Sequence, residues 1–136
     1  MIIVDTNIIT YLHLPTEYTS FAEKLFLLEP EWAAPYLWRS EFRSVLTLYM
    51  RKALITYEKA LQIQNQAESL ICHHEYSLSS FDILSVINNS TCSSYDCEFV
   101  ALAQKLQSKL VTEDKKILRE FPETALSLQQ ALSMLT

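Results

Sequence analysis

Glycine is missing from this sequence: none of the 136 residues is glycine, where an average usage of about 7% would give roughly nine or ten. Three kinds of site need glycine, because their backbone must turn sharply or approach a ligand closely. They are the phosphate-binding P-loop, the GxGxxG turn of dinucleotide-binding domains and the GxSxG turn of serine hydrolases. The composition therefore excludes all three.

Long apolar runs are missing as well. No apolar run approaches the ~18 residues that a membrane-spanning helix needs. The apolar start of the chain, residues 1–5, is too short to be a signal peptide. We therefore expect a cytoplasmic protein without a membrane partner.

Cysteine and histidine are few and poorly spaced for metal binding. The three cysteines, Cys72, Cys92 and Cys97, are odd in number and show no CxxC spacing, which argues against a disulfide framework or a thiolate zinc site. His73 and His74 are adjacent, so they lack the HxxxH spacing of two ligands on one helical face. We expect reduced thiols and a polar helix end.

Composition and charge are those of an ordinary globular domain. With 49% hydrophobic and 20% charged residues, we predict one domain over residues 1–136. The formal net charge of −5 does not favour a polyanionic partner such as nucleic acid. A divalent metal in an acidic site reverses the local charge, however, so a nucleic-acid substrate stays open.

Hydrophobic periodicity predicts strands and helices that alternate along the chain. We predict strands at residues 2–4, 31–34, 75–78, 109–112 and 125–128, and helices at 8–14, 19–28, 36–52, 56–73, 79–88, 95–107, 114–121 and after 128. Such alternation predicts an α/β protein, in which helices cover both faces of a parallel sheet.

The first predicted strand ends in a carboxylate. Ile2, Ile3 and Val4 form an apolar β-branched run, which is typical of a buried parallel strand, and Asp5 follows at once. Open α/β sheets bind their ligands at the carboxyl ends of such strands. The alternative is that Asp5 only caps the helix that follows.

Helix geometry, at about 100° per residue, tests which other acids point inward. Glu41 lies on an apolar helical face, whose other members are Leu37, Val45 and Leu48. Arg39 and Arg43 project from the opposite side. An acid within an apolar stripe is informative, because an unpaired buried charge is costly. The alternative is a carboxylate that reaches solvent along the helix surface.

Asp96 and Asp114 pass the same test. Asp96 shares a helical face with Phe99, whereas Glu98 lies about 200° further around and points away. Asp114 follows a predicted strand and precedes an apolar helical face, and its neighbour Glu113 is expected to face solvent. Each aspartate has an alternative role at the start of its helix, Asp96 through the helix dipole and Asp114 as a cap.

Four carboxylates in one cleft would repel one another unless a cation joined them. Ligands that offer only oxygen suit the hard ions Mg²⁺ and Mn²⁺. Such an ion lowers the pKa of a bound water and orients it on a phosphodiester, which is the chemistry of metal-dependent nucleases. The spacing alone does not establish that the four acids converge.

The chain also resembles the PIN domain, specifically the VapC-type toxin ribonucleases of bacterial and archaeal toxin–antitoxin operons. The resemblance lies in four segments that occur in this order: IIVDTNIITYL, PYLWRSEFRSVL, SSYDCEFVALAQKL and LVTEDKKILREFP. It covers nearly the whole chain. It implies a three-layer α/β/α sandwich with a parallel sheet of four to five strands.

The resemblance further implies the site, the cofactor and the partners. The acids that bind Mg²⁺ or Mn²⁺ and hydrolyse RNA fall on Asp5, Glu41, Asp96 and Asp114, the four acids that helix geometry selects. Positions that support or border the site fall on Thr6, Asn7 and Thr112. The expected partners are an RNA substrate, a cognate antitoxin protein and a second copy of the chain in a homodimer.

From the sequence we therefore predict a metal-dependent endoribonuclease, the toxin of a VapBC-type pair. One alternative is a PIN-fold scaffold that binds proteins without cleavage, and another is an RNA-processing nuclease outside toxin–antitoxin systems. A receiver-type phosphoacceptor or an aspartate-nucleophile phosphatase ranks lower, because the phosphatase needs DxD where this chain has Asp5-Thr6-Asn7. Five aromatic residues are candidates for stacking on bases, although most are expected in the core or an interface: Tyr11, Trp32, Tyr36, Trp38 and Tyr95.

Overall fold

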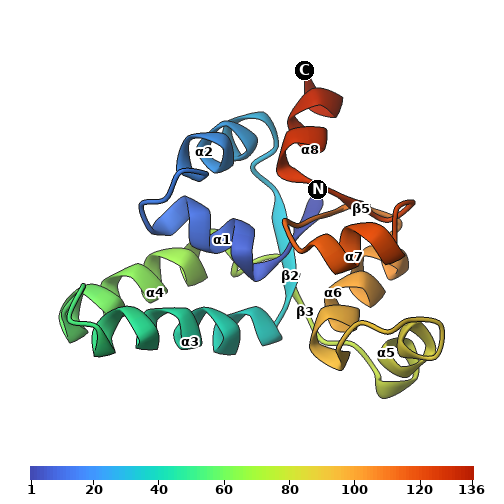
Figure 1. Ribbon diagram of the computed structural model, residues 1–136, viewed down its shortest axis with the longest axis horizontal. Helices are drawn as coiled ribbons and strands as arrows, with labels where there is room; N and C mark the ends of the chain where they lie inside the picture. Colours follow the sequence, from blue (N-terminus) through green and yellow to red (C-terminus); the bar gives the residue numbers. More distant parts are fainter.

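The structure is a computed structural model that describes all 136 residues, and its strands and helices alternate as the sequence predicts (Figure 1). The strands are β1 (Ile2–Val4), β2 (Trp32–Pro35), β3 (Glu75–Tyr76), β4 (Leu110–Val111) and β5 (Ala125–Leu126). The helices are α1 (Thr6–His13), α2 (Thr19–Leu28), α3 (Leu37–Arg51), α4 (Tyr57–Ile71), α5 (Ser80–Ile87), α6 (Ser94–Lys105), α7 (Lys115–Glu120) and α8 (Leu128–Leu135).

The five strands form one sheet in the order β3-β2-β1-β4-β5, and every neighbouring pair is parallel. The chain builds outward from β1 to β2 and β3, and then returns to the other side of β1 to add β4 and β5. The order of the strands therefore reverses between β1 and β4, where open α/β sheets form their binding crevice. The predicted parallel sheet of four to five strands is confirmed.

The last three strands are shorter than predicted, at two residues each where four were expected. The reason is visible at β4 and β5, where the residues that follow serve as helix caps or support them. Ser127, for example, accepts the backbone N–H of Gln130 and starts α8. The polar residues that follow these strands therefore lie at the carboxyl edge of the sheet.

Helices cover both faces of the sheet, as Figure 1 shows: α1, α3 and α4 lie on one side of the strands and α5 and α6 on the other. The core between these layers holds one cluster of apolar side chains, of which the largest are Trp32, Trp38, Phe42 and Phe99. The three-layer α/β/α arrangement is therefore confirmed. None of the helices combines the length and the apolar character needed to cross a bilayer.

A buried carboxylate fixes the start of α3 against β3. Glu75, whose side chain is 1% exposed, accepts hydrogen bonds from Arg39 Nε and Nη2, both at 2.6 Å, and from Trp38 Nε1 at 2.8 Å. Burial raises the pKa of Glu75, but these donors outweigh it and hold the pKa below its ordinary value. Arg39 also pairs with Glu68 of α4 at 3.1 Å. The side of α3 that carries Arg39 therefore faces β3 and α4 rather than open solvent.

Two helices end in backbone conformations that normally use glycine. Ala53 after α3 has φ 57° and Gln107 after α6 has φ 51°. Each end has the two hydrogen bonds of a Schellman motif. The longer-range bond runs from Leu54 N–H to Tyr49 C=O at 2.9 Å in one and from Ser108 N–H to the carbonyl of residue 103 at 3.0 Å in the other, and Ala53 and Gln107 donate the second bonds at 2.9 and 3.2 Å. A side chain at φ > 0 costs about 1–2 kcal/mol in the left-handed region. The missing glycines therefore carry an energetic cost.

We expect Ala53→Gly and Gln107→Gly each to stabilise the protein. Glycine removes the steric cost of the left-handed conformation and loses part of that gain to the greater freedom of the unfolded chain, which leaves about 0.5–1 kcal/mol. Thermal unfolding should show a midpoint about 2–5 °C higher for each variant. The matched control is Gln66→Gly in the exposed middle of α4, which should lose about 1 kcal/mol. A lower midpoint for Gln107→Gly would contradict this account.

Candidate active site

The site begins where β1 and β4 end side by side. Asp5 follows β1 and is 7% exposed. Its Oδ1 accepts the backbone N–H of Thr6 at 2.7 Å, which caps α1, and its Oδ2 accepts the hydroxyl of Thr112 at 2.7 Å, just past β4. Asp5 therefore does cap the helix, and its carboxylate also lies at the crevice of the sheet.

Thr6 connects Asp5 to Glu41. The hydroxyl of Thr6 donates to Glu41 Oε1 at 2.7 Å, which joins the first turn of α1 to the first turns of α3. The face predicted for Glu41 needs a correction: the core face of α3 carries Trp38, Phe42 and Leu46, while Leu48 is 57% exposed. The large aromatic side chains of Trp38 and Phe42 pack into the core and so determine which face of α3 is buried. Glu41 is therefore half-buried at the margin of the core rather than inside it.

Asp114 and Asp96 approach from the other side of the crevice. Asp114 caps α7, because its Oδ1 accepts the backbone N–H groups of Lys116 at 2.9 Å and Ile117 at 3.1 Å. Its own N–H donates to the Thr112 hydroxyl at 3.0 Å, so Thr112 contacts two of the four acids. Asp96 lies in the first turn of α6, where the α6 cap Ser93 accepts its N–H. The predicted capping or dipole positions are thus real for both aspartates.

All four acids line one open cavity of about 330 Å³. The residues around it come from β1, α1, α3, α6 and the start of α7, and they are Asp5, Thr6, Asn7, Thr10, Tyr11, Glu41, Val45, Asp96 and Asp114. Six of these are the site or supporting residues predicted from the sequence, and Tyr11 is a predicted stacking candidate. Thr10 and Val45 are additions, and helical spacing marks both, because each stands four residues after Thr6 or Glu41.

Burial and the charges of neighbouring acids raise the pKa values of Asp5, Glu41 and Asp96. Burial raises the pKa of Asp5 from 3.8 to about 7, and the charges of Glu41 and Asp96 add to the effect, although hydrogen bonds from Thr112 and Thr6 oppose it. Burial also raises the pKa of Glu41 and that of Asp96, and the charge of Asp114 raises the latter further. None of the four forms an ion pair. The site therefore concentrates negative charge without a partner from the protein.

The donor set fits a hard divalent cation in its chemistry. The cavity offers carboxylate and hydroxyl oxygens, which Mg²⁺ and Mn²⁺ prefer, and holds no thiol or imidazole. The four carboxylates surround the cavity without meeting at one point, since no group of three or more Asp, Glu, His or Cys side chains is close enough together to hold a metal ion. Each acid therefore lines the cavity, and the side chains would have to turn before they could share one ion.

Two neighbouring acids are less exposed than the helical pattern predicts. Glu98 is half-buried, and its charge is one of those that raise the pKa of Glu41. Glu113 is also half-buried, and it lies beside Leu128 and Leu132 of α8. Sequence spacing places both residues away from the cavity, but it does not register the helices that pack against them.

The aromatic candidates separate clearly. Trp32 and Trp38 are fully buried in the core, where most of the five aromatic candidates were expected. Tyr36 and Tyr95 are exposed but do not line the acidic cavity. Tyr11 does line it, and its ring contacts that of Tyr18 with a centroid separation of 4.8 Å.

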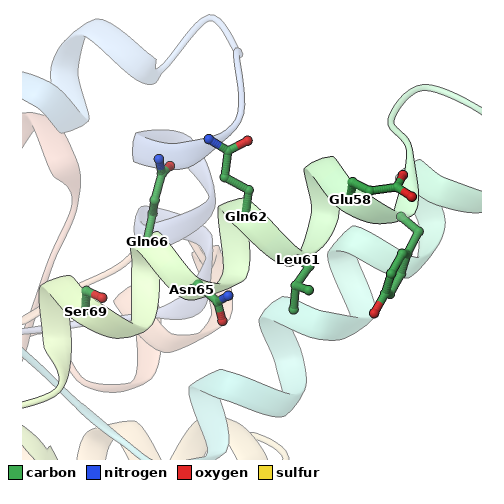
Figure 2. A pocket seen from close by; sticks show the side chains of 7 residues that line it. Glu58, Leu61, Gln62, Asn65, Gln66 and Ser69 are labelled. Atoms are coloured by element: carbon green, nitrogen blue, oxygen red, sulfur yellow. The ribbon is translucent and has the colours of Figure 1, made fainter.

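A larger hollow of about 590 Å³ lies along the outer surface of α4 (Figure 2). It is lined by Tyr57, Glu58, Leu61, Gln62, Asn65, Gln66 and Ser69. Figure 2 shows its labelled side chains projecting to different sides of a single helix rather than toward a common point. With one carboxylate and no neighbouring strand end, it lacks the convergent polar groups that mark a catalytic site.

Comparisons with known proteins found a matching family, a similar ribonuclease and similar structures. The PIN domain family matches residues 2–123. Ribonuclease VapC3 of Pyrobaculum aerophilum is 27% identical over 127 residues, which span 89% of this chain and 95% of that protein. The crystal structure of PAE2754, also from Pyrobaculum aerophilum, superposes with a TM-score of 0.77 at 19% identity and covers 98% of this chain and 94% of that one.

A toxin–antitoxin complex from Klebsiella pneumoniae is a further structural neighbour, with a TM-score of 0.71 and 17% identity over 94% of this chain and 98% of that chain. At identities this low, the structural matches show a shared fold and nothing more. The family match rests on the sequence itself and includes the strand ends and helices that carry all four acids. The chain therefore belongs to the PIN domain family.

Proposed function

We propose that this protein is a metal-dependent endoribonuclease and the toxin of a VapBC-type toxin–antitoxin pair. The observation that carries the proposal is the gathering of Asp5, Glu41, Asp96 and Asp114 around one open cavity at the crevice of a parallel sheet. The likeness of the chain to Ribonuclease VapC3 supports this activity, and its likeness to a chain of the toxin–antitoxin complex supports this setting.

The four acids would hold Mg²⁺ or Mn²⁺ jointly. The bound ion would lower the pKa of a water molecule and offset the charge that develops on a scissile phosphodiester. Glu41 and Asp96 stand on different helices across the cavity, so a turn of these two side chains would bring the carboxylates together. Positive charge at the site would favour the ionised form of Asp5, against the burial that raises its pKa.

The chain's own polar residues position these acids. Thr6 holds Glu41 through its hydroxyl and Asp5 through its backbone N–H, and Thr112 holds both Asp5 and Asp114. Asn7 accepts the N–H of Glu113 at 3.4 Å and thereby ties α1 to the segment that ends in Asp114. These bonds fix the direction of the Asp5 carboxylate and the backbone position of Asp114, and they hold Glu41 beside α1.

We propose single-stranded or looped RNA as the substrate, because its phosphates and bases are accessible in a way that those of a duplex are not. The proposal includes a cytoplasmic setting, one domain over residues 1–136, a homodimer and inhibition by an antitoxin segment that folds on binding. Exposed apolar side chains at the α3–α4 end, Leu48, Leu54 and Leu61, support a protein partner.

A second candidate is a PIN-fold scaffold without catalysis. It is favoured by one specific observation: no three acids stand close enough together to hold a metal ion. Metal binding separates the two candidates, since the nuclease must take up Mg²⁺ or Mn²⁺ at the four acids and the scaffold need not.

We expect purified protein to cleave looped RNA with Mg²⁺ or Mn²⁺ and to lose this activity in EDTA, because water activation would depend on the ion. The measurement is the initial rate on a fluorescent hairpin RNA, together with a calorimetric titration of Mn²⁺. Calorimetry should show binding that Asp96→Asn weakens. Full activity in EDTA would refute the metal mechanism, and neither binding nor cleavage would favour the scaffold.

We expect Glu41→Gln and Asp96→Asn each to lower the cleavage rate by about 100-fold or more, since each keeps the shape of a ligand while removing its charge. The control is Glu123→Gln, an exposed acid that lies outside the acidic cavity. It should stay within a few-fold of the wild-type rate. Equal losses in all three variants would mean that overall charge, and not this cavity, governs the activity.

We expect Asp5→Asn to change how stability depends on pH in metal-free buffer. The folded-state pKa of Asp5 is raised to about 7, so its stabilising contribution is full below its unfolded pKa near 4 and is lost as the pH rises through 7. The melting temperature of Asp5→Asn should therefore rise relative to wild type between pH 5 and pH 8. The control Asp82→Asn should show no such change over this range, because the pKa of Asp82 is lowered by its bond to Lys105.

A further inference from the structure

A second cavity lies beside the acidic one, between α2 and α8. It measures about 230 Å³ and is lined by Tyr18, Phe21, Glu113, Leu128, Gln129 and Leu132. We call it the α2–α8 pocket. Its lining combines two aromatic rings, an apolar floor, one carboxylate and one amide, and it includes no lysine, arginine or histidine.

The α2–α8 pocket adjoins the acidic cavity. The ring of Tyr11 lines the acidic cavity and contacts the ring of Tyr18, which lines the pocket. Glu113 lines the pocket and is followed directly by Asp114, which lines the acidic cavity. An RNA strand bound across the acidic cavity would therefore pass next to the α2–α8 pocket.

We propose that the α2–α8 pocket binds the base of a nucleotide next to the scissile phosphate, an inference that rests on the proposed ribonuclease function. Phe21 and Tyr18 are 50% and 37% exposed, so their rings are open to a stacked base. The volume is below the roughly 300–1,000 Å³ of pockets for drug-sized ligands. It therefore suits one planar base and not a whole nucleotide.

The carboxylate of Glu113 determines which bases fit. A carboxylate accepts hydrogen bonds and would repel a phosphate, because the pocket holds no cation to balance it. Adenine, cytosine and guanine carry an exocyclic amino group that can donate to it. Uracil has no amino group, and its one donor on that edge, the ring N3–H, lies between two carbonyl oxygens that a carboxylate would repel. The pocket should therefore prefer a base with an amino group and disfavour uracil.

The test begins by mapping the bond that the wild-type protein cuts in a looped RNA, and then replaces the nucleotide on either side by adenosine, cytidine, guanosine, uridine or an abasic unit. At one of the two positions, uridine and the abasic unit should each lower kcat/KM by about 10-fold or more. Stacking on one aromatic residue accounts for roughly 5- to 150-fold.

Two variants with matched controls locate this preference. Phe21→Ala should remove the difference between a base and the abasic unit, while Leu27→Ala, 82% exposed on the same helix, should keep it. Glu113→Gln should remove the discrimination against uridine, because an amide can donate to a carbonyl, while the exposed Glu23→Gln on α2 should keep it. Thermal unfolding of each variant checks that it is folded.

Binding measurements distinguish failure of this inference from failure of the proposed function. Fluorescence anisotropy with oligomers of adenosine, uridine and abasic units, in a Glu41→Gln background, should show the same order of affinity and its loss in Phe21→Ala. If binding shows this order of affinity but the wild-type protein does not cleave RNA, the proposed nuclease activity is refuted and the base-binding pocket stands. Metal-dependent cleavage with base preferences unchanged by Phe21→Ala and Glu113→Gln would overturn the base pocket alone. If these two variants keep the base preferences of the wild type but no longer bind a protein inhibitor, the pocket binds that protein and not a base.

Discussion

A carboxylate buried at the end of a central strand is costly unless hydrogen-bond donors surround it, and the site is arranged around this constraint at Asp5. Two donors reach it, one from the start of α1 and one from the residue after β4. Because those donors belong to neighbouring elements of the sheet, satisfying Asp5 also fixes α1 against the β1–β4 crevice. The same two threonines continue outward, Thr6 to Glu41 and Thr112 to the backbone of Asp114. The positions of three acids thus follow from one buried group.

Helix capping and acid clustering are two results of one arrangement here. Asp5 and Asp114 are the caps of α1 and α7, and Asp96 occupies the first turn of α6. In an open parallel sheet the helices that follow the strands begin at the carboxyl edge, so residues that stabilise helix starts come together there. Capping offers backbone N–H groups that offset part of the repulsion between the acids. This allows four carboxylates to line one cavity without any ion pair.

Local patterns in the sequence predict most of the fold and the set of acids that line the cavity. The β-branched run before Asp5 and the alternation of elements are enough to predict the parallel sheet. What the sequence alone does not determine is rotation and packing. The face of α3 is set by Trp38 and Phe42, which draw the helix inward and leave Glu41 at the margin of the core. Glu113 is half-buried because α8 packs near it, and no spacing along its own helix indicates that contact.

The absence of glycine has opposite consequences at the helix ends and at the site. At the ends of α3 and α6, Ala53 and Gln107 adopt a left-handed conformation that glycine would adopt without steric cost. A phosphate bound in a P-loop or a GxGxxG turn would require glycine in the same way, because the ligand must approach the main chain closely. The acidic cavity instead presents side-chain oxygens, which need no close approach of the backbone. A site that would hold phosphate through a metal ion and carboxylates is therefore compatible with a chain that has no glycine, whereas a glycine-rich phosphate loop is not.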